Sequence, residues 1–487
     1  MTTRSLHTVL ALLGLTSACG GESTPTLPPP GHHVVTIDTD AIVPPDPMRT
    51  VDAKAPIPLF DRLELAVLRD GETTPEAENV RDFQVDASRF TDGGASFTVQ
   101  GMPGERVRVR ARLSRTASTF GGVSRPESTI EVTAALPPTP DEGSLATTLL
   151  LLTEDVGVPQ GSSESPLEVD AAESALVRPS TSEPSRVRTW AQAAAVPCKG
   201  EPLKSETCIE GGAYWMGNPL VKGDDFVESD RQRLVVLSPY FLDTREVRVG
   251  ELRTWLATQP KELADKVVRR GADLTKEDYF CTYSDVADPA NDALPANCLG
   301  WEVASAYCKA RGGELPSEAQ FEYASSELRS ALFVWGTDEA PLCEAAVWGR
   351  SGLEGSAIAA LGSSECQTIT GKNGAQPLPD EPDARNLTRL TDRITIGGVE
   401  VFDLAGNLQE WVRDRYNKQT EPCWQLDGTN VFFDPVCTTP GSLGGRSVRG
   451  GSWLQDREFL RAAYRASRAD DEGGSYAVGF RCARPAG

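Results

Sequence analysis

Alternating apolar and polar side chains characterise the first third of the chain. Residues 107–113 alternate valine, alanine and leucine with Arg108, Arg110 and Arg112. A two-residue repeat places the apolar side chains on a buried face of a β-strand and the arginines on the opposite face. Similar short runs occupy residues 63–68, 97–99, 128–134 and 146–153. The pattern predicts a small sandwich of immunoglobulin-like type over residues 33–155, with the arginines on a solvated face.

The composition changes after this region. No Trp or Tyr precedes Trp190, and residues 156–196 are rich in Ser, Pro, Glu and Ala, which favours a linker. From residue 197 to 487 the chain is dense in Gly, Trp and Cys, as in a second folded domain. Residues 301–310 have helical periodicity, and Ser317 with Gln320 has the spacing of a capping box that starts a helix.

The N-terminus has the pattern of an export signal. Arg4 precedes the apolar run from Val9 to Leu15, which is too short to span a bilayer. The sequence then resembles a bacterial lipobox ending at Cys19. We predict a signal peptide over residues 1–18, a lipid-modified Cys19 and a flexible tether over residues 19–32. The expected location is the bacterial envelope, at the outer membrane or facing the periplasm, with the lipid as the only membrane contact. The alternative is an ordinary signal peptide with an incidental cysteine.

Charge and residue usage exclude several functions. A net charge of −22 argues against nucleic acid and against electrostatic docking on anionic lipid. The only histidines are His7, His32 and His33, so a Ser-His-Asp triad, His-ligated zinc and two-His-one-carboxylate iron are excluded from the second domain.

Ten cysteines lie between Cys198 and Cys482, an even number that favours disulfides in an exported chain. Their connectivity does not follow from the sequence alone. Proximity in the sequence suggests the pairs Cys198–Cys208, Cys281–Cys298, Cys343–Cys366 and Cys423–Cys437.

Six motifs occur in order in the second domain. They are GGAYWMG at 211–217, LPSEAQFEYA at 315–324, VWG at 334–336, FDLAGNLQEW at 402–411, RGGSW at 449–453 and GFRCA at 479–483. Together they resemble the formylglycine-generating enzyme family, also called the sulfatase-modifying factor family. The resemblance implies an α+β fold of C-type-lectin-like kind and a bridge between Cys308 and Cys482.

The copper-binding cysteines of active family members are missing. The family places them three and eight residues after the serine of the RGGSW motif, where this chain has Gln455 and Leu460. Cu(I) is a soft ion that amide oxygen binds poorly and hydrocarbon cannot bind. A second bridge of the animal enzymes is also absent, because its positions lie near Ser326 and Arg465. We therefore expect neither bound copper nor formylglycine formation.

The resemblance also implies a structural calcium ion. Its ligands would be the side chains of Asp403 and Glu410 and the carbonyl oxygens of Gly406 and Leu408, a hard oxygen set that suits Ca²⁺. The alternative is a tight turn whose acids make ordinary hydrogen bonds. A second family calcium site lacks its asparagine, because Ala346 stands there, and Gln409 replaces a family tryptophan.

The segment after the RGGSW motif is the candidate binding surface, since it mixes charged and aromatic residues. The candidate cleft comprises Ser452, Trp453, Gln455, Arg457 and Tyr464. A solvated charged stretch is the alternative, and we interpret Arg449, Arg481 and the glycines at 450 and 451 as structural.

The expected protein is an envelope lipoprotein without catalytic activity. It would bind an envelope protein or a glycan, or form a structural part of an envelope assembly. Two alternatives remain open: a periplasmic oxidoreductase similar to relatives that act in siderophore maturation, and a sulfatase-modifying enzyme with displaced cysteines.

Overall fold

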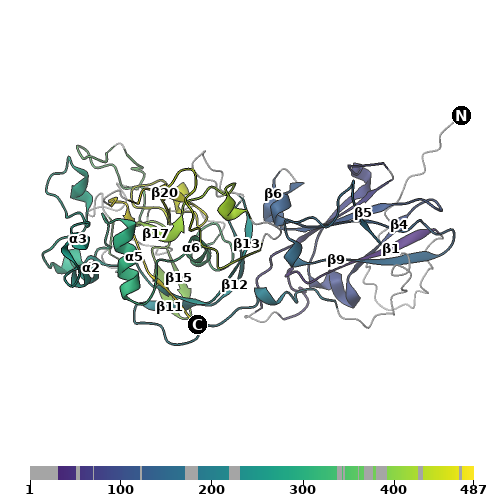
Figure 1. Ribbon diagram of the computed structural model, residues 1–487, viewed down its shortest axis with the longest axis horizontal. Coiled ribbons are helices and arrows are strands. Elements are labelled where there is room, and N and C mark those ends of the chain that lie inside the picture. Colours follow the sequence, from purple (N-terminus) through teal and green to yellow (C-terminus); the bar gives the residue numbers. More distant parts are fainter. Residues whose placement is uncertain are drawn as a thin grey trace. The chain divides into compact units, whose positions relative to one another are not determined.

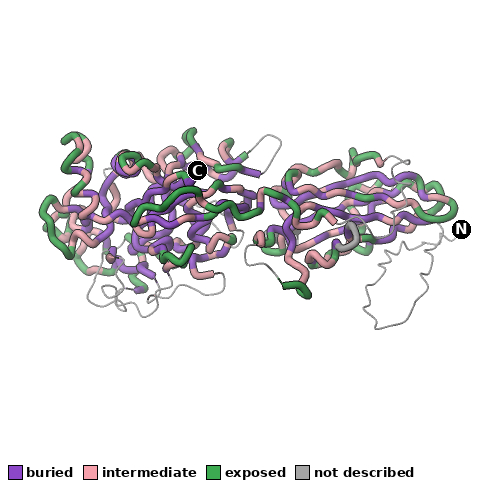
Figure 2. The backbone as a smooth tube through the Cα atoms, turned by 90° about the horizontal axis from the view of Figure 1, so that it is seen from below, coloured by how far each residue is buried: buried purple, intermediate pink, exposed green. Residues whose placement is uncertain are grey.

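The computed structural model describes residues 31–50, 55–69, 71–120, 123–169, 185–218, 231–336, 343, 346–359, 361–366, 377–379, 392–425, 431–470 and 474–487. The predicted signal peptide and Cys19 lie outside these residues. The chain divides into two compact units, formed mainly by residues up to Ala194 and by residues from Ala195 onward. In each unit the buried backbone runs through the interior and exposed residues lie at the loops (Figure 2).

The first unit is built from two β-sheets and a short hairpin. The strand order of one sheet is β4 (Ala95–Gln100), β1 (His32–Thr39) and β9 (Ser144–Leu151). The order of the other sheet is β10 (Leu167–Glu168), β8 (Ile130–Ala135), β5 (Arg108–Ser114), β2 (Arg62–Leu68) and β3 (Val80–Gln84). The hairpin consists of β6 (Thr119–Phe120) and β7 (Val123–Ser124). Strand β1 pairs antiparallel with β4 and parallel with β9. Because β9 also lies against β5 and β8, the two sheets contact each other.

Strand β5 has the expected alternation of buried and partly exposed residues. Val109, Ala111 and Leu113 are buried. On the other face Arg110 lies 3.2 Å from a Glu64 oxygen, and the Arg112 guanidinium lies 2.5 Å from Glu131. The arginines therefore pair with acids of the neighbouring strands β2 and β8, as expected of a structural face.

The structure corrects two predicted boundaries in this unit. His32, assigned to the tether, begins β1 and is buried, because it pairs with Gln100 and Ser144. The predicted linker at 156–196 is wrong for most of its described residues. Residues 167–168 add strand β10 to the sheet, and the Trp190 backbone N–H donates to the carbonyl of Asp40 at 3.0 Å. Serine and proline content alone did not reveal these backbone contacts.

The second unit combines several small sheets with short helices (Figure 1). The sheets in strand order are β11 (Glu206–Ile209), β14 (Tyr240–Asp243) and β22 (Ala483–Pro485); β12 (Gly212–Met216), β13 (Arg233–Leu237) and β18 (Val431–Phe433); β15 (Arg393–Ile396) and β16 (Val399–Phe402); and β20 (Ala466–Arg468), β19 (Arg446–Arg449), β17 (Gln409–Arg415) and β21 (Val478–Gly479). The α-helices are α2 (Val249–Leu256), α3 (Lys261–Ala264), α4 (Pro289–Asp292), α5 (Trp301–Ala310) and α6 (Glu318–Ser325). This is a mixed α+β fold.

Helices α5 and α6 begin where the sequence predicts. At α6 the Ser317 hydroxyl accepts from the Gln320 backbone N–H at 3.1 Å, and the Gln320 side chain accepts from the Ser317 N–H at 2.9 Å. This reciprocal capping box satisfies two backbone donors that a helix start otherwise leaves unpaired. Phe321 and Ala324 then reach the hydrophobic core.

The disulfides of the second unit match the expected pairs. They are Cys198–Cys208, Cys281–Cys298, Cys308–Cys482, Cys343–Cys366 and Cys423–Cys437. The bridge between Cys308 and Cys482 spans 174 residues and joins α5 to the C-terminal segment. A loop of this length gives the bridge a large effect on the entropy of the unfolded chain. Among the residues that the structure describes, no helix has both the length and the apolarity needed to cross a membrane.

Candidate functional site

The RGGSW motif follows the end of β19 and turns sharply into the core. Gly450 and Gly451 have φ angles of 93° and 73°, in the left-handed region that glycine enters without steric cost. A Cβ atom on Gly451 would lie 2.6 Å from the carbonyl oxygen of Phe459. Trp453 is fully buried, and its indole N–H donates to the carbonyl of Tyr476 at 3.3 Å. The motif is therefore packed as a structural turn.

Leu460 fills space at the position of the second family cysteine. Its side chain is 1% exposed and belongs to the hydrophobic cluster that includes Phe321 of α6. Its Cδ2 atom lies 3.1 Å from the point where a Cβ on Gly451 would stand and 3.4 Å from the same point on Gly406. Leu460 thus packs over two glycines whose missing side chains leave room for it.

Gln455 stands at the first family cysteine position and joins a polar group. The Ser452 hydroxyl donates to Gln455 Oε1 at 3.2 Å. Burial raises the pKa of the Tyr464 phenol to about 12, while Arg468 and the side chains of Gln455 and Gln409 act in the opposite direction. Two departures from the family pattern, Gln409 and Gln455, therefore lie near the same tyrosine hydroxyl.

The five residues of the predicted cleft do not share one exposed surface. Ser452, Trp453 and Tyr464 are buried, Gln455 is half-buried and Arg457 is exposed. Asp456 and Glu458, beside Arg457, are exposed as well. Among the described residues of the segment after the RGGSW motif, only the short charged stretch from Asp456 to Glu458 is exposed, next to a packed interior.

The predicted calcium turn lies between β16 and β17. Asp403 and Asn407 both have positive φ angles, 58° and 59°, and the Asp403 side chain is 1% exposed. Asn407 Nδ2 donates to Asp403 Oδ2 at 3.4 Å and to Glu246 Oε2 at 2.6 Å. The Leu408 backbone N–H donates to the other oxygen of Glu246 at 2.9 Å. Glu246 is thus a third acidic residue that contacts this turn, and the sequence analysis did not identify it.

Glu410 is paired with an arginine of the GFRCA motif. Arg481 Nε lies 2.9 and 2.8 Å from the two Glu410 oxygens, and its Nη2 lies 2.6 Å from Oε1. The same guanidinium donates to the carbonyl of Phe402 at 2.8 Å. Both side chains are fully buried, so the pair ties β17, β16 and the C-terminal segment together.

The buried acids of this region act on one another electrostatically. Burial raises the pKa of Glu246 well above its ordinary value, and the nearby charges of Asp403 and Glu410 raise it further, while Arg481 lowers it. Burial also raises the pKa of Glu410, against the opposing effect of Arg481. Arg245 and Arg248 line the same small cavity as Glu246 and Asp403, so several arginines share this acidic region.

The residues present fit calcium in ligand type. Asp403 and Glu410 supply the hard oxygen donors that Ca²⁺ prefers. Two observations limit the fit. Both oxygens of Glu410 already accept from Arg481. Within the described ranges, no three acidic, cysteine or histidine side chains converge as metal ligands.

A second buried ionic network surrounds the start of α6. Glu318 accepts from Arg465 Nε at 2.5 Å and Nη2 at 2.7 Å, and Arg449 donates to Glu322 and to the carbonyl of Ala462 at 3.0 Å. The ion pair between Arg465 and Glu318 therefore joins the segment before β20 to the start of α6.

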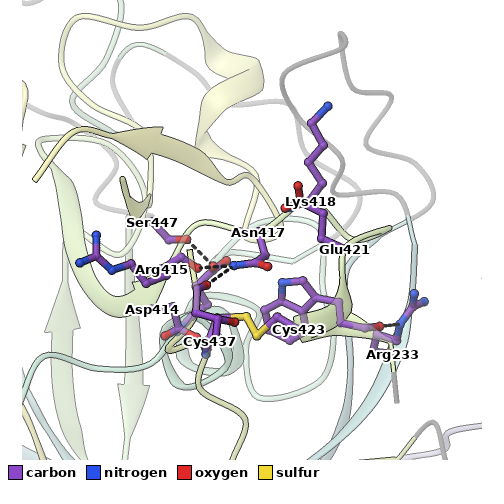
Figure 3. The surroundings of a disulfide bond; sticks show 12 residues. Arg233, Asp414, Arg415, Asn417, Lys418, Glu421, Cys423, Cys437 and Ser447 are labelled. Carbon is purple, nitrogen blue, oxygen red and sulfur yellow. Dashed lines mark hydrogen bonds between the residues drawn. A yellow bond between two sulfur atoms is a disulfide. The ribbon is translucent and has the colours of Figure 1, made fainter. Parts of the chain in front are cut away.

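Asp414 completes this network next to the Cys423–Cys437 bridge (Figure 3). Its two carboxylate oxygens accept from the backbone N–H groups of Cys437 at 2.8 Å and Glu318 at 2.9 Å. Burial, and then the charge of Glu318, raise the pKa of Asp414 to about 7. Asp414 is thus an interior acid that titrates near neutral pH.

Comparison with known proteins supports the motif-based resemblance. The mouse formylglycine-generating enzyme is 27% identical over 197 residues, which cover 39% of this chain and 44% of the mouse protein. The Streptomyces coelicolor enzyme is 27% identical over 196 residues, covering 39% and 53%. The mouse protein described as inactive C-alpha-formylglycine-generating enzyme 2 is 25% identical over 200 residues, covering 40% and 50%. The chain thus spans only about half of these relatives.

Two further comparisons cover most of the second unit. PvdO from Pseudomonas aeruginosa aligns with 59% of this chain and 98% of its own, at 20% identity and a TM-score of 0.36. The model of the sulfatase-modifying factor enzyme 1-like domain matches residues 192–486, more than half of the chain. The chain therefore belongs to the family of proteins that carry a sulfatase-modifying factor enzyme 1-like domain.

Proposed function

We propose that this protein is a non-catalytic member of its family, which uses the domain for binding or as a structural part of an envelope assembly. The observation that carries the proposal is the state of the two cysteine positions. Leu460 is core hydrocarbon, and Gln455 is an amide held by Ser452. Neither side chain supplies the thiolate that Cu(I) requires.

The cysteines of the second domain do not replace the missing pair. The ten cysteines from Cys198 to Cys482 all form disulfides, so none of them offers a thiolate. A relative among those matched is itself described as inactive, which agrees with a family that includes members without the activity. The proposal extends this to the present chain.

The architecture we propose is a lipid-anchored display of the second domain. Cys19 would carry the lipid, and the first unit would act as an immunoglobulin-like spacer that holds a C-type-lectin-like domain away from the membrane. The partner is an envelope protein or a glycan. Metabolic labelling with a palmitate analogue tests the anchor: we expect label on the wild-type chain and none on Cys19→Ser. Equal labelling of both chains would exclude Cys19 as the modified residue.

We also propose that the turn from Asp403 to Glu410 holds a structural calcium ion. Asp403 and Glu410 would contribute carboxylate oxygens, and Gly406 and Leu408 would contribute carbonyl oxygens. Both carboxylates are buried at this turn, and hard oxygen donors of this kind support the role. A bound cation there would keep the start of β17 fixed against Arg481, and it would supply no redox or acid-base chemistry.

A Cu(I) competition titration tests the proposal of lost chemistry. The wild-type chain should compete no better for Cu(I) than a protein without free thiols. The double variant Gln455→Cys, Leu460→Cys restores the family pair on the same backbone and serves as the positive comparison. Tight Cu(I) binding by the wild-type chain would refute the proposal, because it would require a thiolate site that the paired cysteines do not provide.

A further inference from the structure

A cavity of about 700 Å³ opens in the second unit, and no residue of the RGGSW or GFRCA motifs lines it. Its walls come from the end of β11, the loop that follows α6, the VWG segment and strand β15. Strands β11 and β15 lie side by side (Figure 1). The volume falls within the range of about 300–1,000 Å³ that is usual for small-ligand sites.

An aromatic side chain forms part of the cavity wall. The Trp335 ring is stacked on Phe333, with centroids 5.0 Å apart and planes 4° from parallel. Phe333 is buried and supports one face of the indole, and the half-buried Trp335 is among the residues that line the cavity. Leu328 and Ile394, both half-buried, add apolar surface. The wall thus offers a rigid, flat apolar platform.

The charged groups around this platform balance one another. Glu210 and Glu327 are opposed by Arg329 and Arg393 along the cavity wall. Arg329 lies 3.5 Å from Glu327, and Arg393 lies 3.0 Å from Glu400, outside the cavity. An anionic ligand would meet the carboxylates and a cationic ligand would meet the guanidinium groups, so each would encounter side chains of its own charge. A neutral ligand with many hydroxyl groups meets carboxylates that accept and guanidinium groups that donate.

The loop after α6 is held in an uncommon conformation. Glu327 and Leu328 have φ angles of 55° and 57°, in a region that side-chain-bearing residues rarely adopt. The Leu328 N–H donates to the carbonyl of Tyr323 at 3.0 Å, which helps to fix the loop. Such strain is tolerated where the surrounding structure determines the conformation, and it fixes the cavity wall before any ligand arrives.

We infer that this cavity binds a neutral oligosaccharide, with one sugar face packed on Trp335 and hydroxyl groups directed to the surrounding carboxylates and arginines. The inference names a ligand class for the proposed binding role and rests on that proposed function. Sugar binding and loss of formylglycine chemistry are measured separately, so either one can fail without the other.

Isothermal titration of the purified full chain with chitotriose, cellotriose and maltotriose tests the inference. We expect saturable binding of at least one trisaccharide. The variant Trp335→Ala should weaken that binding about tenfold or more, which corresponds to about 1.4 kcal/mol. Trp335→Phe keeps an aromatic platform and should retain most of the affinity. Tryptophan fluorescence melting of each variant verifies that the domain remains folded.

Trp255→Ala is the matched control, because Trp255 is a half-buried tryptophan of α2 that does not line this cavity. It should leave sugar affinity unchanged. The inference would be overturned if none of the three sugars showed saturable binding up to about 10 mM, because that affinity would be weaker than the roughly 4 kcal/mol of millimolar binding. It would also be overturned if the Trp255→Ala and Trp335→Ala variants lost sugar affinity equally. Binding of a charged peptide at this cavity in place of sugar would overturn it as well.

Discussion

Replacing Leu460 with alanine tests whether this family cysteine position has become part of the core. The side chain is 1% exposed and contacts the backbone turns at Gly406 and Gly451. Leucine-to-alanine changes at buried sites cost about 2–5 kcal/mol, because burial energy is lost and a cavity remains. We expect about 3 kcal/mol here, since the two rigid glycine turns prevent the site from collapsing. In a domain of this size that corresponds to a melting temperature lower by about 6–12 °C.

Tryptophan fluorescence is the appropriate assay for this change. Eight of the nine tryptophans lie beyond residue 195, so the signal reports the second unit. Arg457→Ala is the control, because this exposed neighbour should change stability by less than about 0.5 kcal/mol. A loss below about 1 kcal/mol for Leu460→Ala would instead place Leu460 on an open cleft.

Three further predictions concern the buried charges. Burial and the charge of Glu318 raise the pKa of Asp414 from 3.8 to about 7. The contribution of this proton to folding stability is therefore full below pH 3.8 and is lost as the pH rises from 3.8 through 7. Asp414→Asn should flatten the dependence of melting temperature on pH across this range. Arg481→Met should destabilise the second unit by about 3–5 kcal/mol in chemical denaturation, because Glu410 would remain buried without its partner; a loss under about 1 kcal/mol would contradict the assigned pairing. Calcium at 100 times its dissociation constant should add about 2.7 kcal/mol to stability, an effect that Asp403→Asn should abolish; identical melting curves with calcium and with chelator would exclude the site.

Local patterns predicted those features that depend on neighbours in the sequence. The capping box at Ser317 and Gln320 specifies where α6 begins, because both hydrogen bonds form within four residues. The alternation in residues 107–113 specifies β5 for a similar reason, since one strand repeat decides which side chains are buried. The resemblance to the family added the long-range pair of Cys308 and Cys482, which no local pattern contains.

Features that depend on distant partners were missed or misplaced. Glu246 precedes the turn from Asp403 to Glu410 by more than 150 residues, and only the fold brings its carboxylate to Asn407. The backbone of residue 190 packs beside Asp40, although the surrounding composition is typical of a linker. The RGGSW motif identified the turn correctly, yet it gave no sign that Trp453 and Leu460 would be buried. Burial depends on the whole domain, so a charged segment of sequence cannot reveal it.

We propose that this chain keeps the family scaffold and has lost formylglycine formation. Mass spectrometry of a sulfatase-derived peptide, incubated with the purified protein, Cu(I), oxygen and a thiol reductant, measures whether the activity remains. We expect the target cysteine to stay unchanged, at the level of a reaction without protein, while an active family enzyme converts the same peptide. Copper-dependent loss of sulfur from that cysteine to give the aldehyde, catalysed by the wild-type chain, would show that the activity is retained.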